Sequence, residues 1–171
     1  PELIKAVDRV NERQKRVIGR RVLEFYSERS RSESPAEEVG KQEAGPLAGR
    51  TFAVWGPAFK PRTDDIRESA ALVIIEELLG WGGKIQAFDP EELDQERLHF
   101  GDRIQYSGSG YEALRGADSL ILATEWDVFP NPDFGKMKRL LKQPVIFDGR
   151  NQYDSKEMNS KGFVYFGIGR G

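Results

Sequence analysis

Six charged residues crowd into the stretch FAVWGPAFKPRTDDIRES, which runs from residue 52 to residue 69. They are Lys60, Arg62, Asp64, Asp65, Arg67 and Glu68. Long cationic side chains bind phosphate and carboxylate groups through charge-assisted hydrogen bonds. The same cations could pair with the neighbouring acids instead, and the composition of the stretch leaves both interpretations open.

The start of this stretch has the context of a ligand loop. An apolar segment ends at Trp55 and is followed by Gly56 and Pro57, and parallel sheets bind ligands beyond the carboxyl ends of their strands. Asp89 follows a second apolar segment, where a dinucleotide site would place its ribose-binding acid. However, a pyrophosphate loop needs two further glycines, and Gly56 is followed by proline, alanine and phenylalanine. We therefore expect an anion site made of side chains and no dinucleotide site.

Alternating strands and helices must position these residues. Short, mostly apolar strands are expected at residues 51–55, 84–88, 119–123, 145–147 and 163–166. Helices are expected at 70–79, at 111–115 with a capping box of Ser109 and Glu112, and from an N-cap at Asn131 to residue 141. The pattern predicts a doubly wound α/β fold with a mostly parallel, Rossmann-like sheet in which strand 51–55 is central.

Two different segments precede this α/β region. Residues 1–27 carry apolar residues at helical spacing and predict one long amphipathic helix, continuous to about Phe25. Its Leu3/Val7/Val17 stripe could lie on a second copy or on another domain, or the helix could simply be solvated. Residues 28–46 have one large aliphatic residue and no aromatic residue, which indicates a polar linker or insertion. Residues 47–171 form the expected main domain.

The composition limits the possible functions. The 171 residues are 38% hydrophobic, with a net charge of −2, which favours neither nucleic acid nor an anionic membrane as a partner. No long apolar run or leader is evident, so we expect a cytoplasmic protein. The sequence contains no cysteine, and its single histidine, His99, has no metal-ligand spacing and is expected to be an ordinary surface histidine. We predict no metal site and no catalytic residue.

Five motifs together resemble the C-terminal domain of the nucleotide-sugar dehydrogenase family, in particular of its UDP-glucose 6-dehydrogenases. They are FAVWGPAFKPRTDDIRESAALVIIEELL, AFDP, ADSLILATEWDVF, PVIFDGRN and GFVYFGIGR, and they span residues 47–171 almost continuously. The first helix resembles the family's central helix. TEWD, at residues 124–127, is similar to the UDP-glucose enzymes more than to their relatives.

The resemblance implies a double oxidation of UDP-glucose to UDP-glucuronate with NAD as cofactor. It also implies an N-terminal domain of the same protein that holds NAD, an upstream catalytic cysteine, and a homodimer through the first helix. The present chain would close over the UDP moiety. By the same resemblance, Phe59, Lys60 and Arg150 contact the substrate and Arg67 faces the cofactor, whereas Trp126 and Asp127 are interpreted as structural.

Two alternatives remain open. The chain could be a stand-alone or regulatory module whose loops bind another phosphorylated ligand. It could also be the same domain of a UDP-N-acetyl-sugar or GDP-mannose dehydrogenase.

Overall fold

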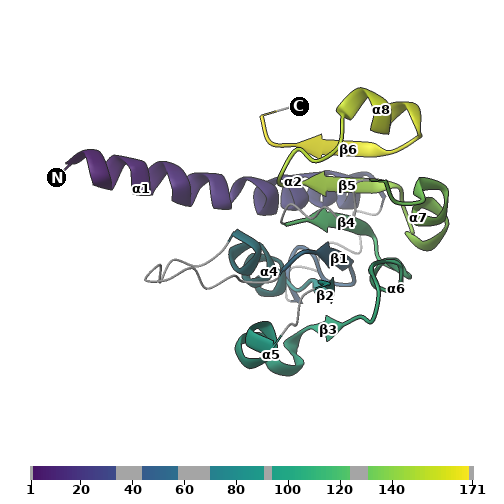
Figure 1. Cartoon of the computed structure of the whole chain (residues 1–171), viewed down its shortest axis with the longest axis horizontal. Coiled ribbons are helices and arrows are strands. Elements are labelled where there is room, and N and C mark those ends of the chain that lie inside the picture. The colour runs from purple at the N-terminus through teal and green to yellow at the C-terminus, as the bar shows by residue number, and fades with distance from the viewer. Residues whose placement is uncertain (1, 34–43, 58–69, 91–93, 124–130, 170–171) are drawn as a thin grey trace.

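The structure is a computed structural model that describes residues 2–33, 44–57, 70–90, 94–123 and 131–169. Its centre is a six-stranded sheet with the order β3-β2-β1-β4-β5-β6, in which every pair of neighbours is parallel (Figure 1). The strands are β1 (Thr51–Trp55), β2 (Lys84–Phe88), β3 (Gln105–Tyr106), β4 (Ser119–Leu122), β5 (Val145–Asp148) and β6 (Val164–Gly167). This confirms the predicted doubly wound fold with β1 between β2 and β4.

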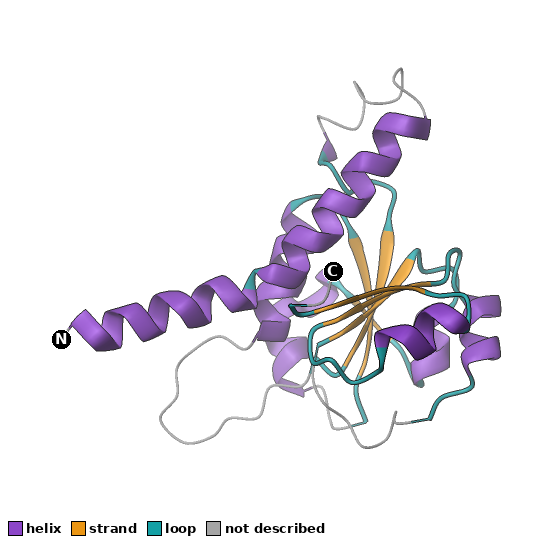
Figure 2. Ribbon diagram, turned by 90° about the horizontal axis from the view of Figure 1, so that it is seen from above, coloured by secondary structure: helices purple, strands orange, loops and turns teal. Residues whose placement is uncertain are grey.

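Side-chain alternation along the strands divides the core into two layers. Phe52 and Val54 of β1 face the layer that holds α2 (Val17–Glu33), α4 (Ala70–Gly80) and α5 (Asp94–Phe100). Ala53 and Trp55 face the layer that holds α6 (Gly110–Leu114), α7 (Phe134–Leu140) and α8 (Ser155–Ser160). Helices therefore cover both sides of the sheet, as Figure 2 shows. Strands β4 and β5 are buried on both faces, and all their residues except Ser119 and Asp148 are apolar.

The N-terminal helix differs from the sequence prediction in two ways. It consists of α1 (Glu2–Lys15) and α2, and its axis changes direction between them (Figure 2). At the break, the Arg16 N–H donates to the carbonyl of Arg13, three residues back instead of four. Helix α2 also continues to Glu33, so residues 28–33, which we assigned to a linker, are helical.

Contacts with the main domain explain why α2 extends so far. The Arg29 guanidinium donates a hydrogen bond to the side chain of Gln143 in the main domain. Within the helix, the same guanidinium lies 5.0 Å from the ring centre of Phe25. Four residues further on, Glu33 lies 3.8 Å from Arg50. Tertiary contacts thus stabilise a helical turn whose composition, taken alone, indicated a linker.

Helix α2 is part of the core of the domain. Ile18, Val22 and Tyr26 are buried in the α4 layer. Phe25 makes edge-to-face contacts with Phe147 of β5 and Phe166 of β6, with ring centroids 5.8 and 5.5 Å apart. These aromatic contacts cover the half of the sheet that α4 and α5 leave open.

Helix α1 has a different environment. Leu3 is 78% exposed and Ile4 is 58% exposed, so at this end the apolar stripe has no cover within the part of the chain that the structure describes. The expected packing of this stripe on another copy or domain therefore stays a prediction.

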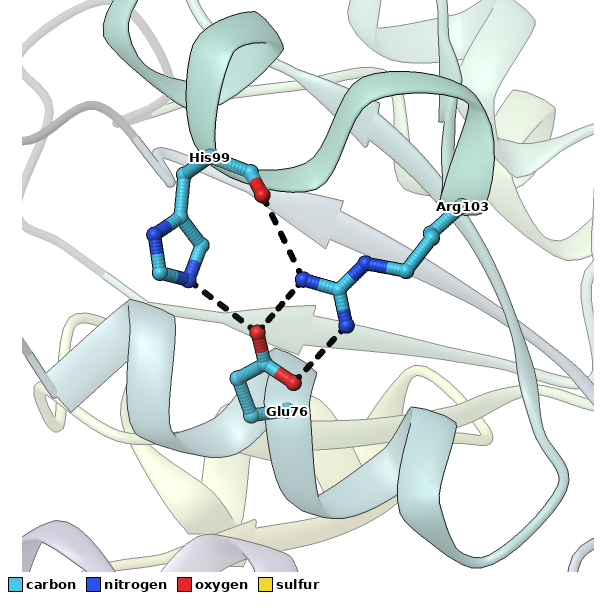
Figure 3. A network of polar contacts seen from close by, with 3 residues as sticks. All are labelled: Glu76, His99 and Arg103. Atoms are coloured by element: carbon cyan, nitrogen blue, oxygen red, sulfur yellow. Dashed lines mark hydrogen bonds and ion pairs between the residues drawn. The ribbon is translucent and has the colours of Figure 1, made fainter.

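A network of polar side-chain contacts connects α5 and the following 3-10 turn η1 (Gly101–Arg103) to α4 (Figure 3). The Glu76 carboxylate accepts two hydrogen bonds from Arg103, at 2.7 and 3.0 Å, and lies 3.0 Å from Nε2 of His99. The hydrogen bond from Arg103 lowers the pKa of Glu76 below its ordinary value. His99 is an exposed residue in a structural polar contact with Glu76, and the described residues contain no group of three or more potential metal ligands.

Capping side chains set where α6 and α7 begin. The predicted capping box forms in part: the Glu112 N–H donates to Ser109 Oγ at 3.0 Å, but the Glu112 side chain accepts from the Gly108 N–H and not from that of the N-cap residue Ser109. The predicted N-cap of α7 at Asn131 is wrong, since the cap is Asp133, which accepts from the Lys136 N–H at 3.0 Å. The Tyr111 hydroxyl accepts a hydrogen bond from the Asp133 N–H and so fixes the position of this cap.

Two buried carboxylates hold opposite ends of the sheet. Asp118, before β4, accepts hydrogen bonds from the Thr51 N–H and from Arg50. Asp148, at the carboxyl end of β5, is fully buried and accepts from the N–H groups of the turn that follows, which belong to Arg150, Gln152 and Tyr153. It also accepts from the hydroxyl of Tyr165 on β6. A buried charge is tolerated when it is satisfied in this way.

Replacing Ile18 by alanine should lower the free energy of unfolding by about 2–5 kcal/mol, because a buried isoleucine leaves a cavity. The matched control is Ile4→Ala on exposed α1, which should change it by less than about 0.5 kcal/mol. Urea denaturation measures both. Equal losses from the two variants would show that α1 is packed as tightly as α2.

The variant Asp148→Asn should lower the free energy of unfolding by about 1–3 kcal/mol, because an amide cannot accept from all the donors that converge on the carboxylate. Asp102→Asn, on the exposed η1 turn, is the matched control and should be close to wild type. Both free energies come from chemical denaturation at neutral pH. A loss at Asp102 as large as that at Asp148 would contradict the role of the buried carboxylate.

Candidate functional site

The strand order reverses at the carboxyl ends of β1 and β4. From β1 the chain continues to β2 on one side, and from β4 it continues to β5 on the other, so the two connections diverge from a common point. Doubly wound sheets bind their ligands in the crevice outside such a switch point. The residues after β1, β4 and β5 are therefore the candidates for ligand contact.

At this edge, backbone hydrogen bonds continue the strand pairing one residue beyond the end of three strands. The N–H groups of Gly56, Ala123 and Gly149 donate to the carbonyls of the neighbouring strands at Phe88, Trp55 and Leu122, at 2.9–3.0 Å. Each donor lies just after its own strand. The ends of four adjacent strands, β2, β1, β4 and β5, are thus joined by backbone hydrogen bonds at the edge where the candidate ligand site lies.

The start of the β1 loop lacks the backbone donors of a dinucleotide site. The Gly56 N–H is already used in the hydrogen bond to Phe88, and Pro57, which is buried, has no N–H group. Asp89, the candidate ribose acid, is also buried, at 6% exposure. The described part of this loop therefore does not fit a nicotinamide dinucleotide, and any anion bound here would need side-chain donors.

Only one of the four predicted site residues lies in the described part of the structure. Phe59, Lys60 and Arg67 fall in the range 58–69, which is outside the described residues, as do Trp126 and Asp127. Arg150 is described and lies in the turn after β5. The described part of the candidate site is therefore this turn.

The turn after β5 leads directly from the row of strand ends to Arg150. At Gly149 a Cβ atom would lie 3.0 Å from the carbonyl oxygen of Leu122 and 3.4 Å from Ile18 of α2, so the backbone approaches both β4 and α2 closely. The next N–H, that of Arg150, is bound by Asp148 at 2.9 Å. The position of the main chain at Arg150 is thus set by contacts with the ends of β5 and β4 and with helix α2.

The side chain of Arg150 is exposed and makes no hydrogen bond or ion pair with any residue that the structure describes. A guanidinium stays charged at every physiological pH and can bind a phosphate or carboxylate with two parallel hydrogen bonds. An exposed arginine on a fixed backbone at the carboxyl edge of a parallel sheet is suited to bind an anionic ligand.

The sequence did not indicate two further residues that shape this turn. Tyr153 is buried beneath it, and burial together with the nearby Asp148 carboxylate raises the pKa of its hydroxyl. Asn151 adopts a backbone φ of 51° and bonds to Ile168, beyond the end of β6. The sequence did contain a signal for an ordered turn here. An aspartate ends an apolar strand and is followed by Gly-Arg-Asn, and Asp and Asn often organise turns.

Comparisons with known proteins agree with this geometry. The model of the UDP-glucose/GDP-mannose dehydrogenase family, UDP binding domain, matches residues 53–155, well over half of the chain. UDP-glucose 6-dehydrogenase of Pseudomonas aeruginosa is 37% identical, over 99% of this chain and 35% of the relative. TuaD, a UDP-glucose 6-dehydrogenase of Bacillus subtilis, is 39% identical over 74% of this chain and 27% of the relative.

Solved structures show the same relationship. A UDP-glucose dehydrogenase from Pyrobaculum islandicum superposes with a TM-score of 0.64 and 30% identity, over 96% of this chain and 31% of the other. A UDP-D-ManNAc dehydrogenase from Pyrococcus horikoshii superposes with a TM-score of 0.65 and 25% identity, over 100% and 34%. The chain thus spans about a third of the length of these relatives. It belongs to the UDP-glucose/GDP-mannose dehydrogenase family, of which it comprises the UDP-binding domain.

Proposed function

We propose that this chain is the substrate-binding part of an NAD-dependent dehydrogenase that oxidises UDP-glucose to UDP-glucuronate. The observation that carries the proposal is the family match, which begins in β1 and includes the turn after β5. Within that match, Arg150 presents an exposed cation beside the switch point. Its role would be to bind the UDP moiety.

The chemistry of oxidation would be divided between this chain and the rest of the protein. Oxidation of an alcohol to a carboxylate through a thioester needs a cysteine nucleophile, and this sequence contains none. NAD would accept the hydrides, held mainly by an N-terminal domain. The present chain binds and orients the nucleotide. Turnover of UDP-glucose by the 171-residue chain alone, free of other enzymes, would contradict this division.

Each predicted site residue has a proposed role. Phe59 and Lys60, from the β1 loop, and Arg150 contact the UDP-sugar. Arg67, at the end of the same loop, faces NAD. Charges from two loops that leave adjacent regions of one sheet edge can converge on a single diphosphate.

The identity of the sugar has two candidates. Curated relatives named UDP-glucose 6-dehydrogenase, including that of Pseudomonas aeruginosa, favour UDP-glucose. The superposition on a UDP-D-ManNAc dehydrogenase along the whole chain favours an N-acetylated sugar. Values of kcat/KM for UDP-glucose and UDP-N-acetylmannosamine separate these two candidates, and the value for GDP-mannose tests the alternative of a GDP-mannose dehydrogenase. A stand-alone phosphate-binding module, the remaining alternative, would turn over none of them in its natural full-length form.

We also propose that α1 mediates a homodimer or contacts the N-terminal domain. Its Leu3 and Ile4 would leave two large apolar side chains in water if they had no partner. Among the described residues, no helix is long and apolar enough to cross a membrane. Light scattering that finds only monomer at micromolar concentrations would contradict the dimer.

The variants Arg150→Ala and Lys60→Ala should each weaken UDP-glucose binding by about ten- to a hundredfold, because each removes a charge-assisted hydrogen bond to the nucleotide. Arg67→Ala should act mainly on NAD. The measurement is isothermal titration calorimetry with the full-length protein, and circular dichroism checks the folding of each variant.

Arg139→Ala, an exposed arginine on α7, is the matched control and should bind UDP-glucose like the wild type. If Arg150→Ala and Lys60→Ala also stay within about twofold of wild type, the charges do not serve the nucleotide and the proposed site is wrong.

A further inference from the structure

Asn151 has an unusual backbone for its residue type. Its φ of 51° lies in the left-handed region, and it is the one residue other than glycine with a positive φ among the described residues. Asparagine tolerates this region better than most side chains, but surrounding contacts must hold it there. Such positions concentrate at functional sites.

The side chain of Asn151 supplies those contacts. Its Oδ1 atom accepts a hydrogen bond from the Ile168 N–H at 2.8 Å, and its Nδ2 atom donates to the Ile168 carbonyl at 3.1 Å. Both ends of one amide thus bind both backbone groups of one residue. The pairing of β5 with β6 ends at Asp148 and Gly167, so this amide continues the connection beyond the last pair of the ladder.

Gly167 makes room for this contact. A Cβ atom at position 167 would lie 2.4 Å from Asn151 Oδ1, closer than nonbonded atoms approach. The segment after β6 and the side chain of Asn151 are therefore matched in shape as well as in hydrogen bonding. We call this double hydrogen bond between Asn151 and Ile168 the amide clamp.

Arg150 lies between two anchors as a result. On one side its N–H is bound by the buried carboxylate of Asp148, and on the other the next residue is held by the amide clamp. Its guanidinium is left free of every described residue. The two anchors fix the direction in which the arginine leaves the backbone, while the side chain itself remains available to a ligand.

We propose that Asn151 is a positioning residue that holds Arg150 ready for the anionic part of the nucleotide, by tying the turn after β5 to the segment after β6. This inference rests on the proposed function of Arg150. A preorganised arginine loses less conformational freedom when it binds, and the ligand gains affinity accordingly. The end of β6 thereby contributes to nucleotide affinity through the clamp.

The test uses the full-length protein with UDP as the probe and calorimetry as the measurement. Asn151→Gly keeps the left-handed backbone accessible but removes the amide, and Gly167→Ala forces the amide out of place from the opposite side. Each should raise the Kd for UDP by about three- to tenfold, with faster hydrogen exchange at the Ile168 N–H. Asn159→Gly, at an exposed position on α8, is the matched control and should leave the Kd within about twofold.

A double-mutant cycle separates positioning from a general loss of structure. If Asn151 acts through Arg150, Asn151→Gly should have no further effect on UDP binding in an Arg150→Ala background. A further loss of the same size in that background would overturn the proposal, because it would show that the clamp supports the fold and not the arginine.

The same experiment distinguishes failure of this proposal from failure of the proposed function. If Arg150→Ala weakens UDP binding while Asn151→Gly and Gly167→Ala bind UDP like wild type, the clamp does not position the arginine and only this inference falls. If Arg150→Ala itself binds UDP like wild type, the proposed role of Arg150 falls first and the inference falls with it.

Discussion

The buried carboxylate of Asp148 is the constraint on which the candidate site depends. A charge with no solvent access must be satisfied by donors, and here the donors are three N–H groups of the following turn and a hydroxyl on β6. The conformation of the turn is therefore a consequence of burying this charge. Because Arg150 lies inside the turn, its place at the edge of the sheet follows from the same requirement.

Helix α2, like the strands, helps to position the candidate site. Helix α2 buries Ile18 within van der Waals distance of where a side chain at Gly149 would be, and its aromatic residues cover β5 and β6. The same helix leads, through the break at Arg16, to the exposed apolar end of α1.

Most strands of the fold could be predicted from sequence because their burial leaves a clear pattern, on both faces in β1, β4 and β5 and as an alternation in β2 and β6. β1 and β2 match the predicted ranges, whereas β5 extends one residue further, to Asp148, since a buried charge is not recognisable in a strand pattern. β3 has only two residues and gave no signal. The extension of α2 to Glu33 and the clamp of Asn151 on Ile168 were also missed, because both depend on contacts between residues far apart in sequence. Of the candidate site, the family resemblance pointed to Arg150, whose role stays a prediction, and the sequence did not indicate Asp148 and Asn151, which hold its backbone.

The most direct test of this account is a crystal structure of the full-length protein with UDP bound. We expect UDP to lie outside the carboxyl ends of β1 and β4, with a polar atom of the nucleotide within about 3 Å of the Arg150 guanidinium. UDP bound elsewhere, with Arg150 still directed into solvent, would contradict it.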